Sequence, residues 1–315
     1  MTPFEKYGKL SVEGKNLVDA NGNIVQLKGI STHNLNEYPQ YVNEEAFKQF
    51  RDDYKVSIMR LAMYSGFADN HEGYADSDDE HRAELEKIIL KGVDICSKLG
   101  LYCMIDWHIL LDYDPNMHTD MAIRFFKNIC PKLKDCDNVI YEICNEPNMN
   151  LETKEEVTWD QIKNYANQVI PVIKEIDDSK IIIVGTTIWS QGVDEAADSP
   201  LDYDNIMYTL HFYADTHRDK LRDKCIYARQ KNLPIFVTEF GVGRADGDGD
   251  INEEESDKWI SLLNGEKISH IIWNLSNKAE TSSIIASDCD KTYGFTDEEL
   301  TPCGLMMKDI MSRSV

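Results

Sequence analysis

The segment "VIYEICNEPN" (residues 139–148) begins as an apolar run and ends on a cluster of polar groups. One acid, Glu142, lies inside the run, and Asn145 and Glu146 close it before Pro147. A strand that is apolar at nearly every position has both faces buried, as in a parallel sheet covered by helices. Proline cannot donate to a strand ladder, so Pro147 marks its end. The segment therefore predicts a buried parallel strand whose carboxyl end carries polar side chains.

Similar apolar runs recur along the 315 residues, and stretches with helical spacing separate them. The clearest helical stretch, residues 77–100, has an acidic first turn, apolar residues at helical spacing and Gly100 as a stop. Strands that alternate with helices over this length predict an α/β fold, a single (β/α)8 TIM barrel. The predicted strands are 25–32, 56–63, 101–108, 138–146, 180–187, 205–213, 234–240 and 269–276.

Four further stretches have helical spacing. Pro131 and Pro171 fall inside two of them. Proline in a helix interior removes a hydrogen bond and clashes with the preceding turn, so a kink or break is expected at each. The four stretches are 121–134, 159–176, 218–232 and 255–265.

The N-terminal stretch "LSVEGKNLVDANGNIV" (residues 10–25) does not follow the alternation of barrel strands and helices. Gly14 and the pair Asn21-Gly22 are turn signals between short apolar segments, so the stretch predicts a β-hairpin. We expect this hairpin to close the bottom of the barrel. No internal repeat, linker or low-complexity segment is visible, so residues 1–315 are predicted to form a single catalytic barrel domain.

The charge balance excludes several classes of partner. The chain has 33 basic and 56 acidic residues, for a net charge of −23. Such a surface repels phosphate backbones and anionic lipid, so neither a nucleic acid nor a membrane is expected as a partner. No apolar run is long enough to span a bilayer, and residues 1–10 lack the apolar core of a signal peptide. A neutral substrate is compatible with this surface.

Two features raise the question of covalent or metal cross-links. The eight cysteines show no C-x-x-C spacing, which favours buried free thiols, with a Cys289–Cys303 disulfide as the alternative. The acidic stretch 245–257 matches the first half of a calcium-binding EF-hand loop. Ile251 stands where that loop needs glycine, so a solvated loop is the favoured interpretation.

Polar or aromatic side chains follow nearly every predicted strand. In a (β/α)8 barrel the active site lies at the carboxyl ends of the strands. Each such side chain alone has an ordinary explanation, such as a salt bridge or a core contact. Their meeting at one rim is what predicts a site. They are His33, Arg60, Tyr64, Asp106, His108, Asn145, Glu146, His211, Tyr213, Glu239 and Trp273.

Two of these residues decide the predicted chemistry. Glu146 and Glu239 follow the fourth and seventh strands, and paired carboxylates that flank a bond are the apparatus of glycoside hydrolysis. A separation of about 5–5.5 Å lets one carboxylate attack the anomeric carbon with net retention. Arg60 would keep that carboxylate ionised, Tyr213 would orient it, and Asn145 would bond the sugar 2-hydroxyl.

Glu142 is expected to have a structural role. It shares strand parity with Glu146 but lies four residues deeper, at roughly 3.3 Å per residue. A sugar would not reach it there. We expect it to pair with an interior base such as Arg60.

Taken in order, the chain's motifs resemble glycoside hydrolase family 5, and within it the bacterial-type endo-β-1,4-glucanases (cellulases). The resemblance covers about residues 8–285 and is carried by "MRLAMY", "MIDWHIL", "IYEICNEPN", "GTTIWSQGVDEAAD", "TLHFYA", "VTEFG" and "IIWNLSNKAETSS". It implies retaining hydrolysis through a covalent glycosyl-enzyme intermediate, with Glu146 as general acid/base and Glu239 as nucleophile.

The resemblance also implies the remaining site residues, the substrate and the absence of a cofactor. It requires no cofactor and no metal. The implied partner is a β-glucan polysaccharide or oligosaccharide, the protein is expected to be a monomer, and secretion is expected because glucan polymers lie outside the cell. Catalytic partners would be Arg60, His108, Asn145, His211 and Tyr213; substrate would be bound by His33, Tyr64, Trp189, Ala245, Trp273, Lys278 and Glu280.

One motif departs from the family pattern. Where the family often has H-G-L-Q-W, this chain has residues 33–38, "HNLNEY", without the tryptophan that usually stacks on a sugar. Tyr38 or Tyr41 is the expected substitute. The aromatic residues in general suit stacking on sugar rings, and the tryptophans are Trp107, Trp159, Trp189, Trp259 and Trp273.

Several alternatives stay open at this point. Within the enzyme class, mixed-linkage glucan, xyloglucan or β-mannan are alternative substrates. A non-catalytic glycan-binding barrel would be favoured by loss of either glutamate, and both are present. A Schiff-base aldolase would need a lysine at an inner strand end, and none is well placed. A metal hydrolase would need His33, His108 and His211 to converge on an ion.

Overall fold

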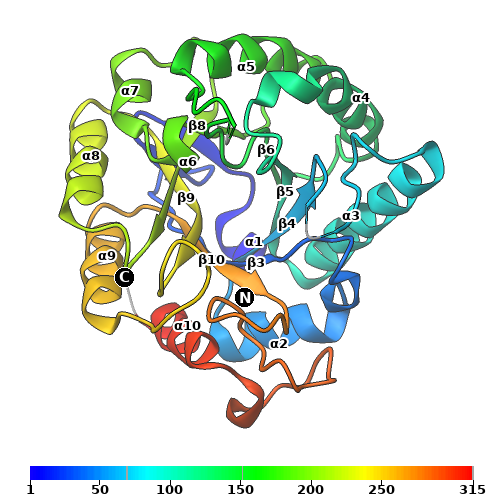
Figure 1. Ribbon diagram of the computed structural model, residues 1–315, viewed down its shortest axis with the longest axis vertical. Helices are drawn as coiled ribbons and strands as arrows, with labels where there is room; N and C mark the ends of the chain where they lie inside the picture. The colour runs from blue at the N-terminus through cyan, green and yellow to red at the C-terminus, as the bar shows by residue number, and fades with distance from the viewer. Residues whose placement is uncertain (69, 151, 314–315) are drawn as a thin grey trace.

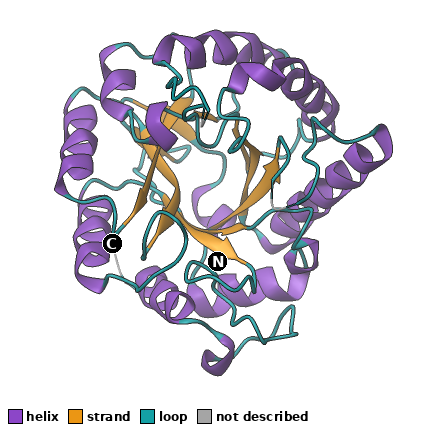
Figure 2. Cartoon of the chain, viewed as in Figure 1, coloured by secondary structure: helices purple, strands orange, loops and turns teal. Residues whose placement is uncertain are grey.

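The computed structural model describes residues 1–68, 70–150 and 152–313. Its centre is a closed barrel of eight parallel strands, and helices surround it (Figures 1 and 2), as the sequence predicts for a TIM barrel. In order around the barrel the strands are β10 (His270–Leu275), β3 (Lys28–Thr32), β4 (Ile58–Tyr64), β5 (Tyr102–His108), β6 (Val139–Glu142), β7 (Ile182–Val184), β8 (Ile206–Tyr213) and β9 (Ile235–Gly241).

The fourth and fifth predicted strands, 138–146 and 180–187, are longer than the observed β6 and β7. Ile143 still donates to the Ile183 carbonyl at 2.9 Å, but the chain then leaves the ladder. The Asn145 carbonyl accepts from a side chain, the Ser190 hydroxyl, at 2.6 Å. Asn145 and Glu146 therefore lie in the segment that follows the strand, not within it.

All five predicted helices are present, and Asn43 caps a further one, α2, by accepting from the Ala46 amide. The break predicted at Pro131 is confirmed, because the α-helix stops at Ile129. A break at Pro171 is wrong, since that helix continues through it for three more residues; the alternative, a kink there, stays a prediction. The α-helices are α1 (Pro3–Tyr7), α2 (Glu44–Tyr54), α3 (Asp79–Leu99), α4 (Thr119–Ile129), α5 (Trp159–Lys174), α6 (Thr187–Ser190), α7 (Val193–Asp198), α8 (Asp219–Gln230), α9 (Glu253–Gly265) and α10 (Pro302–Ser312).

Short 3-10 turns complete the described elements. They precede or follow helices α2, α4 and α10. These turns are η1 (Pro39–Tyr41), η2 (Pro115–His118), η3 (Cys130–Lys132) and η4 (Asp297–Glu299).

The predicted N-terminal hairpin is present as β1 (Ser11–Glu13) and β2 (Asn16–Val18). Gly14 at its turn has φ +56°, a value that favours glycine. Leu10 and Leu17 pack in one apolar cluster with inward-facing barrel residues such as Met104 and Phe236. The hairpin therefore closes the end of the barrel opposite the carboxyl ends of the strands.

Three of the tryptophans belong to the core between strands and helices rather than to a sugar-binding surface. Trp107 and Trp259 are fully buried, and Trp259 stacks on Phe212 with ring centroids 4.0 Å apart. Trp159 is also buried and donates to the Ser199 carbonyl at 2.8 Å. Their burial stabilises the barrel, and each indole contributes a large apolar area.

The cysteines and the acidic loop follow the favoured interpretations. All eight cysteines are free thiols, so the alternative Cys289–Cys303 disulfide is not formed. The loop before α9 is largely exposed, as expected of a solvated loop, and Asp246 forms an ion pair with Arg244. No helix in the described ranges is long and apolar enough to cross a bilayer.

Candidate active site

A cavity of about 580 Å³ opens at the carboxyl ends of the barrel strands. Most of the residues predicted to form the site line it. Three do not: Arg60, Asp106 and Asn145 are fully buried beneath it. The predicted residues that line the cavity are His33, Tyr64, His108, Glu146, Trp189, His211, Tyr213, Glu239, Ala245, Trp273, Lys278 and Glu280.

The cavity also has lining residues that the sequence did not single out. They come from the segments that follow the strands, including the short helix α6, where hydrophobic periodicity gives no signal. Ser282 and Gly247 are linked across two such segments, because the Ser282 amide donates to the Gly247 carbonyl at 2.9 Å. The additional lining residues are Leu110, Ile188, Gln191, His217, Asp246, Gly247 and Ser282.

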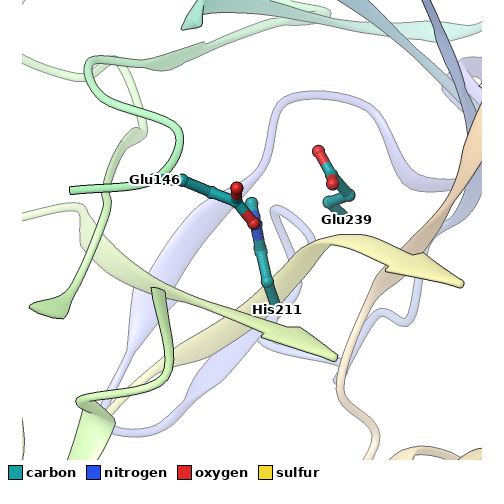
Figure 3. Close-up of side chains that lie close together, drawn as sticks. All are labelled: Glu146, His211 and Glu239. Carbon is teal, nitrogen blue, oxygen red and sulfur yellow. The ribbon is translucent and has the colours of Figure 1, made fainter. Parts of the chain in front are cut away.

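Glu146, His211 and Glu239 all line the cavity, and their side chains lie close together (Figure 3). His211 and Glu239 are partners in the β8–β9 ladder, which aims both side chains the same way. One side-chain ligand atom from each of the three residues lies within 4.8 Å of the others. The two carboxyl groups therefore lie close together in one cavity.

Arg60 is the cation beneath this pair. It donates from Nη1 to Glu239 Oε2 at 3.2 Å and from Nε to Glu142 Oε2 at 2.8 Å. Its Nη2 contacts Asp106 Oδ2 at 2.9 Å. Burial alone would lower the pKa of Arg60, but these carboxylates outweigh burial and raise it. The expected Arg60–Glu142 pair is confirmed, and Glu142 is fully buried out of reach of a ligand.

Glu239 is held by two donors. The Tyr213 hydroxyl donates to Oε1 at 2.8 Å, and Arg60 donates to Oε2. Burial and the neighbouring Glu146 raise the pKa of Glu239, while His211, Arg60 and His108 act in the opposite direction. Donors to both oxygens favour the ionised carboxylate over the acid.

Glu146 is the more strongly perturbed of the two acids. Its Oε1 lies 2.9 Å from His211 Nδ1, and no cation contacts it within the described chain. Burial raises the pKa of Glu146 to about 8, and the charges of Asp106 and Glu142 add to that effect while Arg60 opposes it. The surroundings of the two acids therefore differ: burial without a cationic contact favours the protonated form of Glu146, whereas two donors favour the ionised form of Glu239.

Asn145 is fully committed to contacts within the protein. Its Oδ1 accepts from Arg60 Nη2 at 2.6 Å, and its Nδ2 donates to the Ile109 carbonyl at 3.1 Å. The same nitrogen lies 3.2 Å from His108 Nε2, while His108 Nδ1 lies 2.7 Å from Asp106 Oδ2. Asn145 therefore ties the histidine to the arginine.

Aromatic rings form the walls of the cavity. His108 stacks between Tyr64 and Trp273, with centroids at 4.2 and 5.3 Å. Trp189 also lines the cavity. Neither Tyr38 nor Tyr41 lines it, so the expected substitution for the missing tryptophan is wrong. Tyr41 is 1% exposed and packs on the core ring of Phe295.

The segment that presents Trp189 has an uncommon backbone. Ile188, Trp189 and Ser190 have φ values of 55°, 53° and 57°, a left-handed turn made without glycine. Each such residue costs roughly 1–2 kcal/mol relative to a right-handed conformation. The Trp189 amide donates to the Pro147 carbonyl at 2.8 Å, so contacts to the Glu146-bearing segment hold the turn.

Glu146, His211 and Glu239 are also the described residues whose ligand atoms lie close enough to share a cation. A protonated carboxyl is a poor metal ligand, and both nitrogens of His211 already have hydrogen-bond partners. His33 and His108 do not join His211 in such a group within the described chain, so the metal-hydrolase alternative loses its ligand set. The absence of a metal stays a prediction.

Comparison with known proteins gives a consistent result. Residues 18–279 match the sequence model of the cellulase family, glycosyl hydrolase family 5. The chain is 45% identical to endoglucanase A of Butyrivibrio fibrisolvens over 308 residues, 98% of this chain and 69% of that protein. It is 44% identical to an endoglucanase of Clostridium saccharobutylicum over 302 residues, 96% and 64% of the two chains. It thus spans about two thirds of the length of these relatives.

Solved structures agree with the sequence matches. The catalytic domain of endoglucanase Cel5A from Thermobifida fusca, crystallised as a variant with cellotetraose, superposes with a TM-score of 0.90 and 34% identity. The match covers 99% of this chain and 100% of that one. The cellulase Cel5C_n superposes with a TM-score of 0.89 at 41% identity, over 99% of this chain and 94% of that one.

Proposed function

Because the chain belongs to the cellulase family, glycosyl hydrolase family 5, we propose that it is a retaining endo-β-1,4-glucanase. The observation that carries this proposal is the pair Glu146 and Glu239. The two carboxyl groups face one cavity, and their surroundings favour opposite protonation states.

The proposed reaction is a double displacement. Glu239 attacks the anomeric carbon while Glu146 donates its proton to the leaving oxygen, which gives a glycosyl-enzyme ester and a shortened chain. Glu146 then removes a proton from water, and the water displaces Glu239 with net retention. The oxygen separation of at most 4.8 Å supports this route, because inversion needs about 6.5–9.5 Å between carboxyl groups to admit water.

The other predicted residues support these two. Arg60 and Tyr213 orient the nucleophile, and His211 contacts the acid. His108 and Asn145 hold Arg60 and the aromatic wall in place. We propose that sugars bind along the cavity walls through His33, Tyr64, Trp189, Ala245, Trp273, Lys278 and Glu280.

The substrate we propose is the β-1,4-glucan chain of cellulose or a related β-glucan. The curated relatives are named endoglucanases, and the Thermobifida fusca structure contains cellotetraose. We further propose that residues 1–315 act as one catalytic domain, as a monomer, and outside the cell, where the polymer is found. The non-catalytic alternative is disfavoured, since both carboxylates are present and oriented.

The experiment that tests the proposal measures reducing-sugar release from carboxymethylcellulose, β-mannan, xylan and mixed-linkage glucan. Wild type should cut the cellulose derivative, and Glu239→Ala should be inactive while folding normally. Proton NMR of the first product should show the β-anomer, as retention requires. Preference for mannan would change the substrate only; an active Glu239→Ala or an α-anomer would overturn the mechanism.

A chelator arm tests the absence of a metal in the same assay. Activity should be unchanged after dialysis against EDTA. A loss that zinc or calcium restores would show that Glu146, His211 and Glu239 hold an ion, and would replace the two-carboxylate mechanism.

A further inference from the structure

A chain of hydrogen bonds leads from the cavity into the barrel interior. His211 Nδ1 lies 2.9 Å from Glu146 Oε1 (Figure 3), and His211 Nε2 lies 2.8 Å from Thr238 Oγ1. The Thr238 hydroxyl lies 2.5 Å from Glu142 Oε1. Thr238 and Glu142 are fully buried, so water does not compete for the inner bonds. The chain therefore connects Glu146 to an acid that no substrate reaches.

Glu142, at the inner end of this series of hydrogen bonds, determines which groups donate and which accept. Glu142 accepts a hydrogen bond on each oxygen, from Arg60 Nε at 2.8 Å and from Thr238. Its ladder partner Asp106 has one oxygen, Oδ1, without a hydrogen-bond partner among the described residues. Burial raises the pKa of both carboxyls to about 7, but Glu142 has a donor on each oxygen, which favours its ionised form. Glu142 is thus the ionised, accepting member.

The number of protons on the Thr238 hydroxyl determines which nitrogen of His211 is protonated. A hydroxyl has one proton to donate and two lone pairs with which to accept. Thr238 donates its only hydroxyl proton to Glu142. Its oxygen therefore accepts from both His211 Nε2 and the Thr209 hydroxyl, and the two threonine oxygens lie 2.5 Å apart. His211 must then carry its proton on Nε2.

The charge of His211 determines how many protons its ring holds. Burial lowers the pKa of His211 to about 4, although Glu239 and Glu142 act in the opposite direction. The ring is therefore neutral and holds a single proton. With that proton on Nε2, Nδ1 can only accept, and the group facing it on Glu146 must donate.

We propose that Thr238 and Glu142 are positioning residues that fix the tautomer of His211 and thereby keep the acid proton on Glu146 before substrate binds. The inference rests on the proposed role of Glu146 as the acid. Neither positioning residue lines the cavity. The charged and titratable groups that face the chain from neighbouring strands are Arg60, Asp106, His108, Tyr213 and Glu239.

The proposal predicts that Glu142→Gln reverses the donor–acceptor direction of these hydrogen bonds. The substitution does so without deleting a heavy atom. Arg60 would keep the amide oxygen as its acceptor, so the amide NH2 would face Thr238 and donate. Thr238 would then turn its proton toward His211 Nε2. His211 would carry its proton on Nδ1 and donate to Glu146, which favours the ionised form of that carboxyl.

The direct measurement is 15N NMR of the His211 imidazole, identified by the signals that disappear in His211→Gln. Wild type and Thr238→Ser should show a protonated Nε2 and a bare Nδ1, whereas Glu142→Gln should show the opposite tautomer. Thr238→Val, which removes the link, is a second variant and should lose the Nε2 preference. A wild-type ring protonated on Nδ1, or a tautomer unchanged in both Glu142→Gln and Thr238→Val, would overturn the proposal.

Kinetics supply a second readout. In Glu142→Gln the basic limb of kcat/KM on cello-oligosaccharides should move to lower pH by about one unit, a roughly ten-fold loss on its far side. With a dinitrophenyl cellobioside, whose leaving group needs no proton, the pH profiles of wild type and Glu142→Gln should coincide on the basic side. A pH shift of equal size on both substrates would contradict the assignment. The NMR measurement needs no turnover, so a wild type inactive on every glucan would overturn the proposed function alone.

Discussion

The Ser190 hydroxyl donates to the Asn145 carbonyl oxygen at 2.6 Å, which ties the left-handed turn of α6 to the segment that bears the acid. Both residues are fully buried. The Trp189 amide makes a parallel contact to the Pro147 carbonyl at 2.8 Å. A strained turn and a segment that has left the strand ladder thus satisfy each other's backbone groups, and Glu146 lies between the two attachment points.

Ser190→Ala should therefore impair catalysis as well as stability. The change leaves the buried Asn145 carbonyl without that donor, at a cost of about 1–3 kcal/mol. Urea unfolding should show this loss, and kcat should fall more than KM changes because Glu146 is displaced. Ser256→Ala is the matched control: Ser256 is 1% exposed and its hydroxyl has no partner in the described chain. Equal effects of the two variants would contradict the supporting role of Ser190.

The activity should depend on pH as the two carboxyl environments dictate. Glu146 must be protonated, and burial raises its pKa to about 8, so kcat/KM should decline as pH rises through about 8. Glu239 must be ionised, and its raised pKa places the acidic limb above the ordinary carboxyl value. A profile measured on cellopentaose from pH 4 to 10 checks both limbs. A basic limb near the ordinary glutamate value would show that Glu146 is not held as the acid.

Glu146→Gln should raise thermal stability at neutral and alkaline pH. The pKa of Glu146 is about 8 in the folded protein against 4.5 in the unfolded chain, so between those values the folded state binds more protons. Stability then falls as pH rises through this window. The amide removes that dependence, so the Tm of the variant should exceed that of wild type by more at pH 8 than at pH 4. An equal Tm difference at both pH values would contradict this linkage.

Trp189→Ala should weaken substrate binding and leave the fold intact. Trp189 is half-buried and lines the cavity, so its loss removes a stacking surface and should raise KM on soluble glucan about ten-fold, equal to about 1.4 kcal/mol. Tyr41→Ala is the contrasting variant. That ring is buried in the core, so its loss should lower the Tm and leave KM unchanged. A KM effect from Tyr41→Ala would mean that the tyrosine reaches the substrate after all.

Much of the fold could be predicted because burial on both faces leaves a continuous apolar run, visible in segments such as 101–108. The site could be predicted from the position of polar residues at the ends of those runs. Helix α2 lies outside the predicted helices, although Asn43 caps it and Phe47, Phe50 and Tyr54 are buried along it. Helix α10 gave little periodic signal, because buried methionines and a glycine occupy much of it.

Other features had no signal in the sequence. The end of β6 depends on a hydrogen bond from Ser190, which lies 45 residues away in the chain. The left-handed conformation of Ile188 contradicts the preference of a β-branched residue, so only tertiary contacts explain it. His217 lines the cavity because the loop after β8 turns back and its Nδ1 accepts from the Tyr213 amide at 2.9 Å.

The eight free thiols carry a consequence for how the protein fails under heat. No covalent cross-link holds the described fold together, so reductant should leave the native state untouched. Unfolding releases all of the buried sulfur at once, and in air the exposed thiolates couple between chains. Inactivation should then become irreversible and governed by time at temperature rather than by an equilibrium. The same enzyme should recover its activity on cooling when oxygen is excluded.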